Sequence, residues 1–139
     1  MTILQRLAAV SATAAIIAAP AFLASSAEAA PAAKKWGVVA KAWGAKQQAC
    51  KVSIQGGDAW KVFTRVVNGR TAEVGVGLIV RVDGEEADRF STPLTKKRKT
   101  SKAGSVVLPV AEGYVLEAFQ FQGGMGNGGE VSIAKIRKC

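Results

Sequence analysis

The chain has 139 residues, of which 19 are Lys or Arg and 10 are Asp or Glu, so its formal net charge is +9 at pH 7. It contains no histidine, which excludes catalysis by a histidine base and removes the most common zinc ligand. This length favours one compact domain, and the charge favours polyanionic partners.

The first thirty residues have the pattern of a secretory signal peptide. Arg6 precedes an apolar, alanine-rich stretch over residues 7–24, and the small residues of a cleavage site follow at 27–29. Such a stretch fits a cleaved segment better than a membrane anchor. We therefore predict that residues 1–29 are removed and that the mature chain is secreted, extracellular and without a transmembrane anchor. The Ala, Gly and Val bias of the chain and its Ala-x-Ala cleavage site together indicate a secreted protein from a bacterium with a GC-rich genome.

Residues 30–48 are predicted to form an N-terminal arm ahead of the main domain, which spans residues 49–139. Trp36 and Trp43 follow a helical spacing, but the glycine after each of them is unfavourable inside a helix. The arm is therefore expected to contain an edge strand or one loose turn. The two tryptophans lie among lysines and are candidate contacts for a sugar or a membrane interface. The alternative is that they cover an open edge or end of the domain.

From Cys50 onward the pattern is that of β-strands. Its clearest run has apolar residues at every second position from Val74 to Val82. Further candidate strands lie at residues 50–54, 60–66, 105–110, 114–121 and 131–133. Turn-forming pairs such as Asn68-Gly69 separate these runs. We predict an all-β immunoglobulin- or fibronectin-like β-sandwich of six to seven antiparallel strands, with a small jelly roll or Greek-key barrel as the alternative.

Cys50 and Cys139 are the two cysteines of the chain. In an exported protein an even number of cysteines most simply pairs, so we predict a Cys50–Cys139 disulfide. A bridge that closes a loop of about 90 residues stabilises the fold by roughly 4–5 kcal/mol at most, through the lost entropy of the unfolded chain. Two free thiols or an intermolecular bond are the alternative.

Three patterns resemble sites of catalysis or of metal or nucleotide binding, but none combines the spacing with the structural context that such a site needs. Four acidic residues between Asp83 and Asp88 match neither a calcium loop nor a glycosidase pair, and are interpreted as a solvated hairpin tip. Ser132 and Lys135 fit a Ser-x-x-Lys pattern, but in a strand they would face opposite ways. The glycines of Gln122–Gly129 lack the helix that a nucleotide-binding motif needs, and are expected to form a flexible loop. We therefore predict no enzyme, no metal and no cofactor.

The segment Thr95–Lys102 concentrates five positive charges between two predicted strands, on Lys96, Lys97, Arg98, Lys99 and Lys102. Such a loop can neutralise several phosphates, sulfates or carboxylates, with binding that weakens steeply as salt increases. No nucleic-acid-binding motif accompanies it, which argues against a specific nucleic-acid partner. We predict a non-catalytic module that binds an anionic cell-wall or extracellular polymer through this loop. Alternatives are a secreted inhibitor or toxin-like effector with a protein partner, or a loop that serves only solubility.

Overall fold

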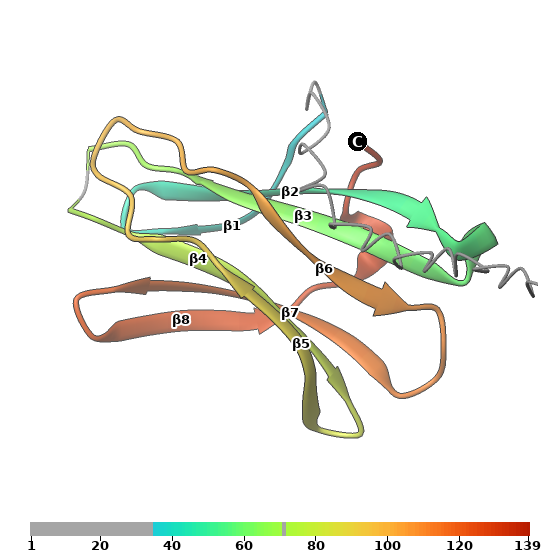
Figure 1. Ribbon diagram of the computed structural model, residues 1–139. Helices are drawn as coiled ribbons and strands as arrows, with labels where there is room; N and C mark the ends of the chain where they lie inside the picture. Colours follow the sequence, from blue (N-terminus) through green and yellow to red (C-terminus); the bar gives the residue numbers. More distant parts are fainter. Residues whose placement is uncertain (1–34, 71) are drawn as a thin grey trace, which may run out of the picture.

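A computed structural model describes residues 35–70 and 72–139, and the predicted signal peptide lies outside them (Figure 1). The described chain contains eight β-strands and two short 3-10 helices, η1 (Gln55–Gly57) and η2 (Ile133–Lys135). The strands are β1 (Gly37–Ala42), β2 (Ala45–Ile54), β3 (Ala59–Val67), β4 (Gly75–Val82), β5 (Glu85–Ser91), β6 (Gly104–Pro109), β7 (Tyr114–Gln122) and β8 (Met125–Glu130). The predicted all-β class is confirmed, with eight strands in place of six or seven.

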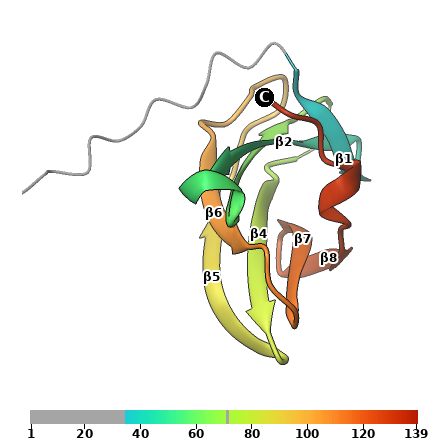
Figure 2. The ribbon, with the colours of Figure 1, turned by 90° about the vertical axis from the view of Figure 1, so that its right-hand side faces the viewer.

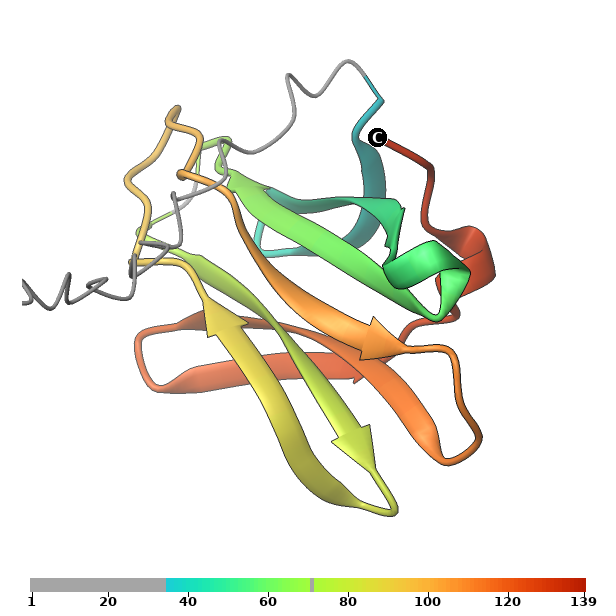
Figure 3. The ribbon, with the colours of Figure 1, turned by 45° about the vertical axis from the view of Figure 1, so that its right-hand side comes forward.

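The strands form two antiparallel four-stranded sheets that pack face to face in a sandwich-like arrangement (Figures 2 and 3). The first sheet has the order β1-β2-β3-β6, and the second has the order β5-β4-β7-β8. The chain therefore crosses from one sheet to the other after β3, β5 and β6. No helix in the described part of the chain is long and apolar enough to span a membrane.

The core forms between the apolar faces of the two sheets. Leu78 and Val80 of β4 are fully buried there against Val62 of β3 and Leu116 of β7. This is the apolar face that the alternation from Val74 to Val82 predicts. Burial of these side chains supplies the main driving force that holds the sheets together.

A buried polar network also joins the two sheets. Gln47 of β2 is 1% exposed, and its Nε2 donates to Thr64 Oγ1 (3.1 Å) in its own sheet and to the Gly77 carbonyl (2.9 Å) in the other. Gln120 of β7 donates from Nε2 to Gln47 Oε1. Because an unpaired buried amide is costly, these bonds favour a single register between the sheets.

Residues 37–42 and 45–48 of the predicted N-terminal arm belong to the first sheet, while residues 30–34 lie outside the described part of the chain. β1 lies at the edge of that sheet and pairs with β2, and the expected boundary between residues 48 and 49 falls inside β2. Trp43 and Gly44 form the tight turn between the two strands, with φ values of 49° and 78°. The spacing of Trp36 and Trp43 therefore reflects a hairpin, because Trp36 precedes β1 and Trp43 follows it.

The glycine-rich segment Gln122–Gly129 is not the flexible loop that its composition predicts. Gly123 and Gly124 form a turn with positive φ, and β8 then pairs with β7 over six residues. β8 is the edge strand of the second sheet and is fully exposed, so its pairing depends on backbone hydrogen bonds and needs no buried side chains.

The strand predicted around residues 131–133 is also wrong, because η2 occupies this part of the chain. Lys135 N donates to the Ser132 carbonyl (3.0 Å), so these two residues lie in a 3-10 turn and the strand-based argument against a Ser-Lys pair does not apply. Both residues are exposed to solvent.

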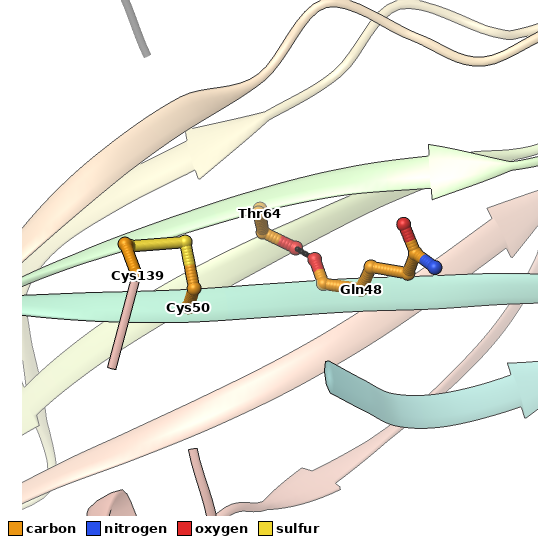
Figure 4. The surroundings of a disulfide bond; sticks show 4 residues. All are labelled: Gln48, Cys50, Thr64 and Cys139. Atoms are coloured by element: carbon orange, nitrogen blue, oxygen red, sulfur yellow. Dashed lines mark hydrogen bonds between the residues drawn. A yellow bond between two sulfur atoms is a disulfide. The ribbon is translucent and has the colours of Figure 1, made fainter. Parts of the chain in front are cut away.

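The predicted disulfide is confirmed, and it fastens the C-terminal segment to β2. Cys50 and Cys139 are bonded across a sequence separation of 89, with Cα atoms 5.0 Å apart (Figure 4). Beside the bridge, Cys139 N donates to the Lys51 carbonyl (3.0 Å), and Lys51 N donates to the Arg137 carbonyl (2.9 Å). The last residues therefore continue the first sheet, because they lie beside β2 and form backbone hydrogen bonds with it.

Lys51 is the one lysine of the described chain that is buried, at 8% exposure. Its Nζ donates to the Ile133 carbonyl (2.5 Å) and lies 4.6 Å from the centre of the Trp60 ring. Burial, and to a lesser degree the positive charge of Lys138, lower the Lys51 pKa. Lys51 thus links β2 to η2 and is not available to an external polyanion.

Candidate functional site

The predicted basic loop connects β5 to β6 and lies at one end of the two sheets. The turns β1–β2 and β7–β8 and the β3–β4 connection reach the same end, on the left of Figure 1. The opposite end carries η1, the β4–β5 hairpin and the β6–β7 connection. Segments that are far apart in sequence therefore present their side chains around the basic loop.

Backbone hydrogen bonds hold the basic loop against the β3–β4 connection. Asn68 N donates to the Lys99 carbonyl (2.9 Å), and Arg98 N donates to the Gly69 carbonyl (2.7 Å). The buried side chain of Asn68 adds bonds from Nδ2 to the carbonyls of Thr95 (2.8 Å) and Ala72 (2.9 Å). The loop backbone is therefore anchored along its length.

The side chains of the loop point to solvent. All five predicted site residues are exposed: Lys96, Lys97, Arg98, Lys99 and Lys102. Arg98 has φ near 60° at the tip of a turn that Lys99 N closes on the Lys96 carbonyl (3.2 Å). A fixed backbone with exposed cations loses little backbone entropy when a ligand binds.

Three further cations lie at this end, and we define the basic end by all eight of these residues. Lys46 pairs in register with Val67 near the end of β3, and Lys41 pairs with Lys46, while Arg70 follows β3. The basic end comprises Lys41, Lys46, Arg70, Lys96, Lys97, Arg98, Lys99 and Lys102. Lys41, Lys46 and Arg70 were not predicted from the sequence, because they are distant from the loop along the chain and reach it only through the fold.

Acidic residues are segregated away from the basic end. Glu73 lies at the basic end, whereas the other acidic residues of the described chain lie in the middle or at the opposite end of the sheets. These are Asp58, Asp83, Glu85, Glu86, Asp88, Glu112, Glu117 and Glu130. The positive potential at the basic end is therefore little compensated.

A shallow hollow of about 530 Å³ lies within the basic end. Its lining consists of Arg70, Ala72, Glu73, Lys96 and Lys97. Three cations thus border one depression, which we call the basic hollow. Because it is bordered by exposed cations, it suits an anionic group on an extended chain better than an enclosed small molecule.

The two candidate tryptophans differ in their surroundings. Trp43 packs against Ala45 and Val66 next to the basic end, where Gly44 lies against Gly69. Trp36 is at the other end of β1, and the Arg65 guanidinium lies 4.5 Å from the centre of its ring. Burial lowers the Arg65 pKa. The structure therefore places only Trp43 beside the basic loop.

Two of the four acidic residues of the β4–β5 hairpin make contacts within the fold. Asp88 Oδ2 accepts a bond from Val107 N (2.9 Å), which links β5 to the edge of the first sheet, and Glu86 lies 3.5 Å from Arg89. Across residues 35–70 and 72–139, no group of three or more acidic, cysteine or histidine residues is arranged to hold a metal ion.

An aromatic surface on the second sheet was not foreseen from the sequence. Phe119 and Phe121 stand on the outer face of β7, with ring centres 6.0 Å apart and an interplanar angle of 28°. They border a hollow of about 520 Å³ together with Arg89, Ser91, Gln120, Gly126, Asn127 and Gly128. We call this the aromatic hollow. In the sequence, phenylalanines alternate in β7 and glycines alternate in β4. That each phenylalanine lies opposite a glycine follows only from the register of the two strands.

Comparisons with known protein families, with curated proteins and with solved structures find no match to this chain. Inference about function therefore starts from two surfaces, the basic end and the aromatic hollow. Both are open to solvent and lie on neighbouring strands. The basic end has the stronger long-range field, because charge acts over about 10 Å at moderate salt.

Proposed function

We propose that this protein is a secreted, non-catalytic module that binds an anionic cell-wall or extracellular polymer through the basic end. The observation that carries this proposal is the separation of charge, with eight cations and one carboxylate at one end of the sheets. Separation of this kind steers a polyanion to one surface and raises its rate of association.

The anchored backbone of the β5–β6 loop supports a binding role over a purely solubilising one. A loop that only keeps a protein soluble needs no fixed shape, whereas this loop makes at least four backbone hydrogen bonds to residues 66–74. The buried Asn68 side chain adds two more. The cations are thereby held in one arrangement before a ligand arrives, which lowers the entropic cost of binding.

The secreted location and the immunoglobulin- or fibronectin-like fold are parts of the same proposal. A disulfide between Cys50 and Cys139 is favoured outside the reducing cytoplasm, which agrees with the signal-peptide pattern. The β4–β5 and β7–β8 hairpins within one sheet, and the β2-β3-β6 neighbours in the other, follow the strand order of such sandwiches. Loops at the ends of these sandwiches commonly carry the binding function.

The salt dependence of binding tests this proposal. We expect the mature protein to bind heparin, used as a polyanion probe, at ~50 mM salt and to lose on the order of a hundredfold in affinity by ~200 mM, because each neutralised anion releases counterions. Isothermal titration across this range measures the slope. Absence of binding at low salt, or an affinity that salt does not change, would contradict it.

A further inference from the structure

We propose that the polymer is an acidic polysaccharide, and that one uronic-acid ring stacks on Phe121 in the aromatic hollow while its carboxylate pairs with Arg89. Acidic groups further along the same chain then meet Lys96, Lys97 and Arg70 in the basic hollow. This inference rests on the proposed function and adds to it the chemical class of the polymer.

The floor of the aromatic hollow is made by the two phenylalanine rings, which lie over glycines of β4. Phe121 pairs in register with Gly75, and Phe119 pairs with Gly77. A Cβ atom at Gly75 would lie 2.1 Å from Phe121 Cζ, and one at Gly77 would lie 2.2 Å from Phe119 Cζ. Only glycine at these two positions leaves room for the rings in this position.

The β8 side of the hollow is left open by two more glycines. Gly126 pairs with Phe121 and Gly128 pairs with Phe119, so no side chain stands beside either ring on this edge strand. Both phenylalanines are only partly buried. The resulting surface is a flat apolar floor with free access from the edge of the sheet, which is the shape that the apolar C–H face of a pyranose ring fits.

Polar side chains border this floor on the β5 side. The Arg89 guanidinium lies 4.9 Å from the centre of the Phe119 ring and is held near Glu86 by a long contact of 3.5 Å. Ser91, which pairs with Gly77 and so lies beside Phe119, adds a hydroxyl group to this border. A guanidinium that recognises a carboxylate, with a hydroxyl group beside it for a ring hydroxyl, suits an acidic sugar better than a phosphate chain or an apolar peptide.

The two hollows follow one another along the second sheet. Gly75, under the Phe121 ring, is two residues from Glu73 in the lining of the basic hollow. Val74, between them, exchanges two backbone hydrogen bonds with Thr95, which immediately precedes Lys96. Two residues of extended chain span about 7 Å, so one linear polymer can occupy both hollows.

Substitution of Gly126 tests the stacking, with Gly129 as a matched control. A Cβ atom at Gly126 has its nearest neighbour 3.9 Å away, so Gly126→Thr fits the strand and places a branched side chain beside Phe121. Gly129 pairs with Ala118, whose side chain faces the interior, and a Cβ atom there has nothing within 4 Å. Gly129→Thr therefore makes the same change on the opposite face of β8.

The probes are an oligogalacturonate and an inorganic polyphosphate with the same number of charges, both measured by calorimetry at low salt. We expect the wild type to bind oligogalacturonate more tightly than polyphosphate, and Gly126→Thr to weaken oligogalacturonate binding by about fivefold while leaving polyphosphate binding unchanged. Gly129→Thr is expected to change neither.

The outcomes separate this inference from the proposed function. If polyphosphate binds as tightly as oligogalacturonate and Gly126→Thr changes neither affinity, stacking on Phe121 is wrong and binding by charge alone stands. If neither probe binds the wild type, the basic end is not a polyanion site, and both the proposed function and this inference are wrong. Circular dichroism and thermal unfolding of both variants show whether the fold is retained.

Discussion

Replacing Lys96, Lys97 and Lys99 together by glutamine is expected to weaken heparin binding by roughly tenfold or more at low salt, and to reduce the slope of log affinity against log salt by about three. The three side chains are exposed, and the loop is held by backbone bonds that glutamine leaves intact. The fold is therefore expected to be unchanged. Calorimetric titrations at several salt concentrations give both quantities.

The matched control removes three cations from the C-terminal segment. Lys135, Arg137 and Lys138 are also exposed, and replacing them by glutamine lowers the net charge by the same three units. Because they lie outside the basic end, this variant should keep most of the affinity and the slope. Equal losses in the two variants would mean that net charge alone, and not the basic end, determines binding.

Removal of the disulfide is expected to lower the free energy of unfolding by about 2–4 kcal/mol. The bond closes a loop with a sequence separation of 89 and so restricts the unfolded chain strongly. It also holds the last residues on β2, where Ile136 is 3% exposed and belongs to the core. Urea unfolding of a Cys50→Ala, Cys139→Ala variant measures the change.

Reduction of the wild type gives an independent comparison. Under reducing conditions the wild type should approach the stability of the double-alanine variant, while the variant itself should not respond to the reductant. An unfolding midpoint that is the same in the wild type, the reduced wild type and the variant would show that the bridge does not contribute to stability.

Regular alternation made β4 predictable from the sequence, because its apolar side chains at every second position face a core that the chain itself supplies. The strands β1 and β2 were harder to predict. Their turn places a tryptophan, Trp43, at positive φ, which this residue type rarely adopts. The segment thus lacked the usual signal of a hairpin and looked like a loosely helical arm.

β8 shows why composition alone misleads at an edge. All six of its residues are exposed, so the strand has no alternation of apolar side chains in its sequence. Its glycines leave room beside the rings of β7, and a side chain at Gly128 would approach Phe119 within 2.9 Å. Conversely, Val131 and Ile133 alternate like a strand but pack as a cap on the core. Both errors have one cause, since the partner surface that decides the structure lies far away in sequence.

The candidate site was predictable only where its residues are contiguous. The five cations between Lys96 and Lys102 were visible as a charge run, and the structure adds Lys41, Lys46 and Arg70 through strand pairing. The aromatic hollow required the register between β4, β7 and β8, which a sequence pattern does not specify. Surfaces built across strands are therefore the part that sequence reasoning missed.

Polymer binding by the basic end and the aromatic hollow is measured most directly by a backbone amide NMR titration of residues 30–139 with an oligogalacturonate. We expect chemical-shift changes concentrated in Thr95–Lys102 and at Arg70 and Glu73, extending to Phe121 in the aromatic hollow, with no change at residues 135–138. Shift changes confined to residues 135–138, or spread evenly over the exposed lysines and arginines, would contradict it.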